Sequence, residues 1–180
     1  MSKIFLRALE IGDLERTYKW HSDENLFKTL GGPFRHVSMA AEKDWLLNKE
    51  KFSNLEINLA ICLIDTHQHI GIISVRDIDW ISRNGNLAGI FIGEPEFRGQ
   101  GFGTDALKSI VKHCFFDLGL NRIYAQILES NIASQKMFEV CGFKIEGKLR
   151  QHSFKDGKFN NVILVGLCVD EYLGVENLNS

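Results

Sequence analysis

The sequence lacks several features that would indicate particular classes of protein. Its 180 residues carry a formal net charge of −2 and a sequence pI near 6.3, so there is no basic excess of the kind that binds nucleic acid. The longest apolar runs are too short to span a bilayer, and no apolar signal segment stands at the N-terminus. We therefore expect a cytoplasmic protein with neither a nucleic-acid nor a membrane partner. The chain shows no internal repeat, and its length predicts one domain.

Cysteine pairs at metal-binding or redox spacing are also absent. The four cysteines stand in apolar surroundings, which predicts buried, reduced thiols: Cys62, Cys114, Cys141 and Cys168. An acyl-cysteine at Cys141 is disfavoured because no activating base is apparent nearby. His67 and His69 are spaced like metal ligands, but with no third ligand near them a solvated turn is the favoured interpretation. No metal is expected.

A glycine-rich loop is the feature around which the rest of the chain is organised. It follows the apolar run from Leu87 to Gly93 and precedes a helix whose apolar residues recur every three or four positions until Gly119. The loop reads Arg98-Gly99-Gln100-Gly101-Phe102-Gly103-Thr104. Glycine has no Cβ, so a ligand can approach the backbone closely. A helix that begins there points unpaired N–H groups and the positive end of its dipole at the loop, which predicts a bound phosphate.

Two common phosphate-binding loops do not match. The nucleotide P-loop needs a lysine between Gly103 and Thr104, and the dinucleotide fingerprint needs glycine at the position of Thr104. The segment resembles instead the Gln/Arg-x-x-Gly-x-Gly/Ala loop of the GNAT superfamily of acyl-CoA N-acyltransferases, with Arg98, Gly101 and Gly103 at the fixed positions.

Downstream motifs extend this resemblance. Asn131-Ile132-Ala133-Ser134 and Cys141-Gly142-Phe143 are similar to the opening and close of a short helix in that family. Glu146-Gly147, the run from Lys155 to Phe159 and a closing strand before Glu171-Tyr172 resemble the subgroup of ribosomal-protein N-terminal and spermidine acetyltransferases. The resemblance implies an α/β (α+β) fold, a mixed, mostly antiparallel central sheet flanked by helices. It implies an N-acetyltransferase (GNAT) domain over residues 1–172 and a polar tail over 173–180.

Individual elements can be placed by pattern. Strands are expected over residues 3–7, 57–64, 70–75, 87–93, 122–128, 143–149 and 162–169. Helices are expected after a cap at Asp13, over 40–49 after Ser38, after the glycine loop, and after Asn131. Residues 76–84 read as a polar connection, with Asn84-Gly85-Asn86 as a turn signal and Asp156-Gly157 as another.

The resemblance also implies a site for acetyl-CoA as co-substrate. Backbone N–H groups from Gln100 to Thr104 would hold the pyrophosphate, with charge from Arg98, and unpaired backbone of the preceding strand would bind the pantetheine arm. An N–H of Ile92 or Gly93 would stabilise the oxyanion. The implied cofactor-binding residues are Phe91, Ile92, Gly93, Arg98, Gly99, Gln100, Gly101, Phe102, Gly103, Thr104, Asn131 and Ser134.

The catalytic assignments are Glu94 and Ser134. Glu94 directly follows the apolar strand and could relay a proton through water, although a solvated acid before a turn is the competing interpretation; Glu96, His152 and Tyr124 are alternatives. Ser134 would lie near the sulfur, and both Ser134 and Asn131 also suit helix capping. Many family members carry a tyrosine acid where this chain has Phe138.

The implied reaction transfers an acetyl group to a primary amine by direct attack in a ternary complex. The acceptor would be a protein N-terminus, a polyamine or an amino sugar. A polyamine pocket should be acidic, which the N-terminal half allows through Asp23, Glu24, Glu42 and Asp44. Acceptor contacts, or ordinary core and turn residues, are Trp20, Phe27, Phe34, Arg35 and His36. The alternative, suggested by Phe138, is a degenerate acetyl-CoA sensor. A homodimer is also expected, because dimers are common among similar proteins.

Overall fold

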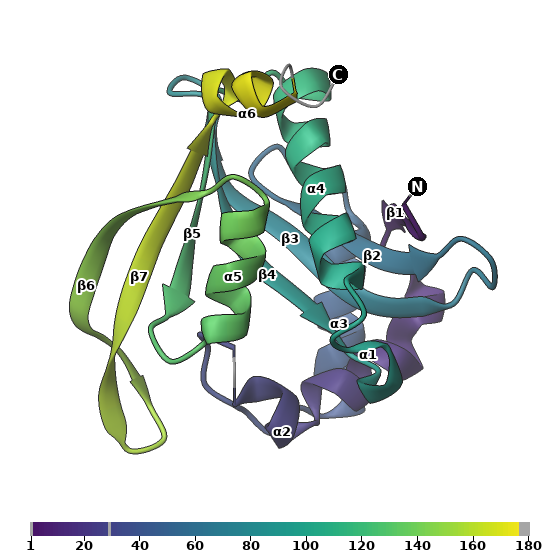
Figure 1. The fold of residues 1–180 in the computed structure, drawn as a ribbon. Coiled ribbons are helices and arrows are strands. Elements are labelled where there is room, and N and C mark those ends of the chain that lie inside the picture. The colour runs from purple at the N-terminus through teal and green to yellow at the C-terminus, as the bar shows by residue number, and fades with distance from the viewer. Residues whose placement is uncertain (1, 29, 177–180) are drawn as a thin grey trace.

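A seven-stranded sheet forms the centre of the computed structural model, which describes residues 2–28 and 30–176 (Figure 1). Its strands lie in the order β1-β2-β3-β4-β5-β7-β6, and every neighbouring pair is antiparallel except the parallel pair β4 and β5. The strands are β1 (Ile4–Ala8), β2 (Ile57–Leu63), β3 (His69–Asp79), β4 (Asn84–Ile92), β5 (Arg122–Leu128), β6 (Lys144–Lys155) and β7 (Lys158–Cys168). The α-helices are α1 (Leu14–His21), α2 (Glu24–Phe27), α3 (Met39–Glu50), α4 (Phe102–Lys112), α5 (Ile132–Val140) and α6 (Val169–Glu176). The expected mixed, mostly antiparallel sheet flanked by helices is confirmed.

Helices cover both faces of this sheet. Side chains of a strand alternate between its faces, and along β2 Ile61 joins a core with α4 and α5, whereas Ala60 and Cys62 join a second core with α1 and α3. Figure 1 shows α4 and α5 together in front of the sheet and α1 and α3 behind it. The apolar periodicity of α4 is therefore explained by burial of one helical face. This helix continues as a π-helical turn, His113–Asp117, and the chain leaves it through Gly119 at φ 65°.

The N-terminal helices form where the sequence predicts them, but one cap differs. Ser38 caps α3, because its hydroxyl accepts a hydrogen bond from the Ala41 N–H at 3.1 Å. Asp13 directly precedes α1 without a side-chain cap bond to that helix. Its carboxylate instead accepts hydrogen bonds from Arg7 Nη1 and Nη2 at 2.8 and 2.7 Å and lies 2.9 Å from His69 Nδ1. The expected cap is wrong, because the Asp13 carboxylate binds Arg7 and His69 instead.

Two strand boundaries also differ from prediction. β3 continues to Asp79 and β4 starts at Asn84, so most of the expected polar connection is strand and the turn lies between them. Asp79 Oδ1 accepts the N–H groups of Ile81 and Ser82 at 2.8 and 3.0 Å, which closes this turn. The end of β3 was not predicted because three of its last four residues, Arg76, Asp77 and Asp79, are exposed polar residues. β6 and β7 are likewise longer than predicted, while the turn at Asp156-Gly157 is confirmed.

The C-terminal part ends in a helix that crosses the end of the sheet. α6 continues past Tyr172 to Glu176, so the first part of the expected polar tail is helical, and residues 177–180 lie outside the described residues.

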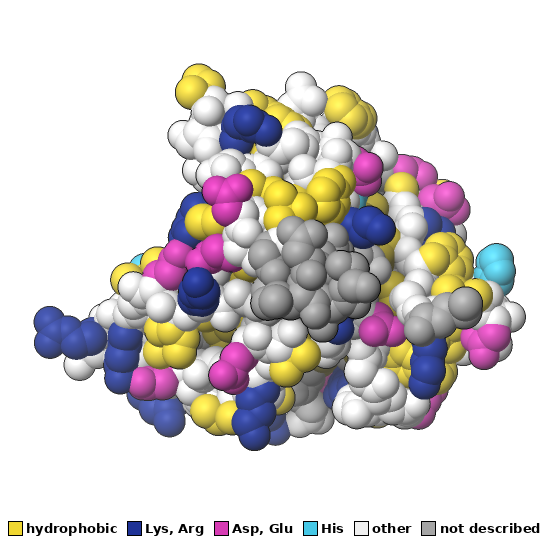
Figure 2. All heavy atoms as spheres, turned by 45° about the horizontal axis from the view of Figure 1, so that its top comes forward, with side chains coloured by type: hydrophobic (Ala, Val, Ile, Leu, Met, Phe, Trp, Pro, Cys, Tyr) yellow, Lys and Arg dark blue, Asp and Glu magenta, His cyan; other side chains and the backbone are white. Residues whose placement is uncertain are grey.

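On the face in Figure 2, acidic and basic side chains are intermixed with hydrophobic ones. None of the described helices is long and apolar enough to cross a membrane.

Candidate active site

A cavity of about 650 Å³ opens where β4 and β5 separate. The two strands pair over three positions only, from Asn84 with Arg122 to Asn86 with Tyr124. Beyond them β4 stays paired with β3 as far as Ile92, and β5 stays paired with β7 as far as Leu128. The sheet therefore divides into two halves, and the inner edges of both line the cavity. Beyond Asn86 the backbone of β4 is thus unpaired toward β5, as expected for a strand whose backbone binds the pantetheine arm.

The edge of β4 presents backbone groups to this gap. The Gly93 N–H donates to Ile70 O at 2.8 Å. In an antiparallel strand alternate residues turn their N–H and C=O to opposite sides, so Phe91 also pairs toward β3 and the N–H groups of Ile90 and Ile92 face the gap. Of the two expected oxyanion donors, Gly93 is excluded by its bond to Ile70 and Ile92 is retained.

The glycine loop closes one end of the cavity. Gly99 and Gly101 have φ values of 75° and 87°, the left-handed region in which only glycine is unstrained. Gly101 immediately precedes α4 and its carbonyl accepts the first helical bond, from the Asp105 N–H at 3.0 Å. The preceding N–H groups of the first turn have no helical partner, and Gly103 and Thr104 line the cavity. This end is suited to an anion.

Two cationic side chains line the cavity. Arg98 lines the cavity and is held in place because its Nε donates to Ile92 O at 2.9 Å and its Nη2 to Gly93 O at 2.6 Å. Lys136, on the exposed face of α5, lines the cavity mouth and escaped the sequence analysis. Among the described lining residues these are the only charged side chains. Gln100 does not line the cavity: its side chain donates to Glu96 O at 2.5 Å.

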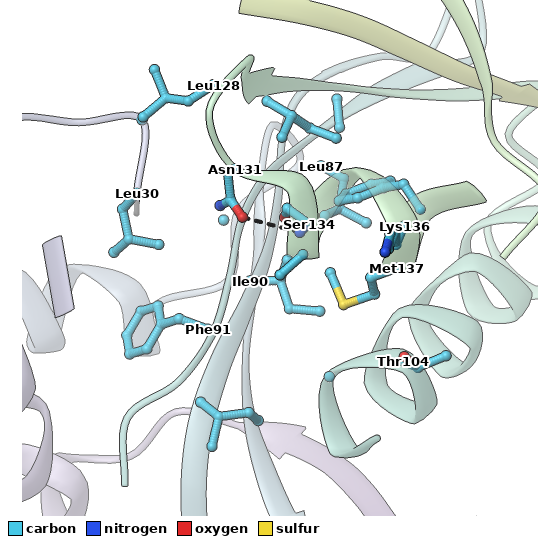
Figure 3. A pocket seen from close by; sticks show the side chains of 18 of the residues that line it. Leu30, Leu87, Ile90, Phe91, Thr104, Leu128, Asn131, Ser134, Lys136 and Met137 are labelled. Carbon is cyan, nitrogen blue, oxygen red and sulfur yellow. Dashed lines mark hydrogen bonds between the residues drawn. The ribbon is translucent and has the colours of Figure 1, made fainter. Parts of the chain in front are cut away.

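Helix α5 forms one wall of the cavity along its whole length (Figure 3). Asn131 caps the helix by accepting the Ser134 N–H at 3.0 Å, and both residues also line the cavity. Asn131 therefore both caps α5 and lines the cavity, so the two roles that the sequence left open are compatible. Met137 lies nearby on the same helix, and a Cβ on Gly103 would stand 3.2 Å from its sulfur, so Gly103 allows α4 to approach α5. The side chains of Thr104 and Ser134 bring hydroxyls to the cavity.

Phe138 takes the place where many family members carry tyrosine. Its ring is 2% exposed and packs edge-on against Phe143 at a centroid distance of 4.9 Å. This position therefore supplies packing and no phenolic proton. The role of Ser134 as a proton donor stays a prediction.

The expected bases lie outside the cavity lining. Glu94 is buried, accepts a bond from Lys19 Nζ at 2.7 Å and another from Trp20 Nε1 at 3.2 Å. Burial acts to raise the pKa of Glu94, but these hydrogen bonds outweigh it and hold the pKa below its ordinary 4.5. A carboxylate so stabilised is a weak base. Tyr124 lies where β4 and β5 still pair, and His152 is exposed on β6.

The other end of the cavity is apolar. It is lined by Asn25 and Leu26 of α2, by Leu30 and Gly31 of the following loop, and by Phe91. Figure 3 shows Leu30 and Phe91 across the cavity from Met137. The aromatic residues expected here are not among the described lining residues. Trp20 packs against Phe91 and His69, and Phe34 packs between Phe27 and His36. Leu26 and Leu30 stand among polar residues in the sequence, and nothing there distinguishes these two cavity residues from ordinary core leucines.

Metal and thiol chemistry have no support in the geometry. No group of three candidate ligands occurs among the described residues. His69, expected in a solvated turn, is 3% exposed, with Nδ1 2.9 Å from Asp13 Oδ1 and Nε2 2.9 Å from Gly71 O. Burial raises the pKa of the Cys141 thiol to about 11 and that of Cys114 to about 12, so both stay protonated at neutral pH.

Comparison with known proteins identifies the family. Residues 3–144 match the family described as "Acetyltransferase (GNAT) domain". The chain is 27% identical over 174 residues to spermidine N(1)-acetyltransferase of Vibrio cholerae, covering 96% of each chain. Identity to a ribosomal N-acetyltransferase-like protein of Bacillus subtilis is 30% over 104 residues, covering 58% of this chain and 56% of the relative. The crystal structure of the Vibrio cholerae spermidine N-acetyltransferase with CoA and spermine superposes with a TM-score of 0.86 at 27% identity, covering 95% of this chain and 98% of that one. A strand gap with a glycine loop and a helix N-terminus at one end suits a CoA thioester, and the chain belongs to the GNAT family as an acetyl-CoA-dependent N-acetyltransferase.

Proposed function

We propose that the acceptor is an α-amino group, such as the N-terminus of a protein or peptide, which attacks the acetyl-CoA thioester as the neutral amine. One observation carries this proposal: no aspartate, glutamate or histidine is among the described residues that line the cavity. The site thus offers neither a proton acceptor for an alkylammonium ion nor a counter-charge for a polycation.

The missing base favours an amine of low pKa. An α-amino group has a pKa of about 8 and an alkylamine about 10.4. At pH 7.5 about a quarter of the first is neutral but only about 0.1% of the second, a ratio near two hundredfold. An α-amine can therefore enter this cavity ready to react.

The missing counter-charge disfavours a polyamine. The acids expected to bind one lie elsewhere, and two of them have structural partners: Asp23 caps α2 through the Asn25 N–H at 2.9 Å, and both Glu42 oxygens lie 2.9 Å from His21 Nδ1. In this proposal the amine enters at the apolar end of the cavity, away from the glycine loop, and no carboxylate among the described lining residues offers a counter-charge to a polycation there. The relative's name and structure record spermidine and spermine for the Vibrio cholerae protein, and we propose a different acceptor here.

The reaction needs few protein groups. The neutral amine nitrogen forms a bond to the thioester carbon, and the Ile92 N–H, on the gap side of β4, donates to the oxygen as it becomes negative. One such donor is worth about 3 kcal/mol. The C–S bond then breaks, CoA leaves as a thiolate, and the nitrogen releases its proton to water.

The buried phenyl ring of Phe138 is compatible with turnover. A thiol has a pKa of about 8.5, so a CoA thiolate leaves without obligatory protonation. The presence of phenylalanine at this position is therefore no reason to prefer the alternative, a sensor that binds acetyl-CoA without turnover. A cytoplasmic location and a homodimer stay predictions from the sequence.

Release of CoA thiol, measured across acceptors, tests the proposal. Peptides with free N-termini, the same peptides with acetylated N-termini, spermidine and amino sugars form the panel. We expect kcat/KM for a free-N-terminal peptide to exceed that for spermidine by at least about tenfold at pH 7.5, given the neutral fractions above. The rate should rise with pH and level off above about pH 8, where the α-amine is neutral. Faster turnover of spermidine, or no dependence on a free N-terminus, would contradict the proposal.

A further inference from the structure

Lys155 holds an unusual place for a lysine. It lies at the end of β6, one residue before the hairpin turn, and is only 8% exposed. Its Nζ donates to the carbonyl oxygens of Phe27, Leu30 and Gly32, the last two at 2.5 and 3.2 Å. An ammonium group has three donors, so each has one acceptor. Among the described residues no carboxylate forms an ion pair with Lys155, and its burial lowers its pKa.

The three acceptors belong to one segment that borders the cavity. We call residues 27–32 the acceptor loop; the structure describes all of them except residue 29. Leu30 and Gly31 line the apolar end of the cavity. A second side chain of the same hairpin, Ser153, donates to Gly31 O at 3.4 Å. In Figure 1 the tip of the β6–β7 hairpin and helix α2, which leads into this loop, both lie at the lower end of the molecule.

The acceptor loop has little regular structure of its own. α2 ends at Phe27 and α3 begins at Met39. Between them, the Leu30 N–H bonds to Phe27 O at 3.2 Å. Carbonyl groups without strand or helix partners need other donors. The hairpin supplies a donor to Leu30 O and Gly32 O and adds a second one at Phe27 O, from more than 120 positions away in sequence. Lys155 therefore ties three carbonyl groups of this loop to the end of β6.

We propose that Lys155 is a positioning residue that fixes the amine-binding end of the cavity through the acceptor loop. This rests on the proposed function, in which the apolar end receives the amine. The other end, with Arg98 and the start of α4, is built from separate elements and does not touch Lys155. Loss of the ammonium group should therefore raise KM for the amine and leave the Kd of acetyl-CoA unchanged.

Three variants separate this role from general stability. Lys155→Met removes the donors and keeps most of the side-chain volume, and Lys155→Arg keeps a donor group of the same charge. Lys158→Met is the matched control, because Lys158 lies directly across the hairpin from Lys155 and is exposed. We expect Lys155→Met to raise KM for the peptide amine about tenfold or more, with kcat changed less than about threefold. Lys155→Arg should recover most of this loss. The Kd of acetyl-CoA, measured by calorimetry, should stay within about twofold in all variants, which also shows that they fold.

Hydrogen exchange tests the contact between Lys155 and the acceptor loop without any amine substrate. Amide exchange in a peptide that covers the acceptor loop should accelerate in Lys155→Met and not in Lys158→Met. If the wild-type protein acetylates no α-amine, the proposed function fails. Hydrogen exchange then still shows whether Lys155 holds the acceptor loop in place. Unchanged loop exchange, or an amine KM that is equal in Lys155→Met and Lys158→Met, would overturn the inference.

Discussion

A single negative charge in the glycine loop should weaken acetyl-CoA binding by a predictable factor. Gly101 stands immediately before α4 and lines the cavity, and a Cβ built on it meets no atom within 4 Å. The space for a side chain exists, so Gly101→Asp would bring a carboxylate toward the phosphates. At about 6 Å and an effective dielectric constant of 20–40, each pair of negative charges costs about 1.4–2.8 kcal/mol. This predicts a Kd about 10 to 100 times higher per phosphate charge.

Gly101→Asn is the matched control. At φ 87° any side chain is strained, but asparagine and aspartate tolerate this region better than other residues and have nearly the same shape. The difference between the two variants therefore isolates the charge. Calorimetry with acetyl-CoA at low and high ionic strength measures it, and the difference should narrow in salt because the loop is open to solvent. Equal affinities of the two variants at low salt would refute the assignment of the loop to the pyrophosphate.

Two further predictions concern the buried carboxylates. Glu94→Gln should lower the free energy of unfolding by about 1–3 kcal/mol, because Lys19 loses its ionic partner, and should leave kcat within about threefold of wild type; a large fall in kcat with unchanged acetyl-CoA affinity would instead establish Glu94 as the base. Asp13→Asn should cost about 3–5 kcal/mol at pH 7, because Arg7 and His69 lose a buried partner. Burial acts to raise the pKa of Asp13, but the bonds from Arg7 and His69 outweigh it and hold the pKa well below 3.8, so its stabilising effect is complete above about pH 5 and is lost as pH falls below about 4. Urea unfolding should therefore show the gap between wild type and Asp13→Asn narrowing in acid, and a gap that persists at low pH would argue against this origin.

Local patterns were sufficient for much of the fold. The periodicity of α4, the cap at Ser38, the stop at Gly119 and the turn at Asp156-Gly157 depend on residues within one or two turns of each other. Such signals are written into a short stretch of chain, because helix periodicity, capping and positive φ are local properties. The glycine loop belongs to the same class, since close approach of a ligand to the backbone is a demand on consecutive residues.

Contacts between distant segments decided the rest. The sequence placed Asp13 as a cap and His69 in a solvated turn, yet the fold buries them together across 56 positions. The sequence favoured Glu94 as base. Only the packing of α1 against the end of β4 shows that Lys19 and Trp20 donate hydrogen bonds to this carboxylate. Two further features are visible only when strands and loops meet in space: no acid or histidine is among the described residues that line the cavity, and Lys155 bonds to the acceptor loop. By itself the sequence determined most of the elements and singled out the glycine loop, because these signals are local. Tertiary structure decided the ends of the polar strands and which side chains line the cavity, because these depend on how the two halves of the sheet separate.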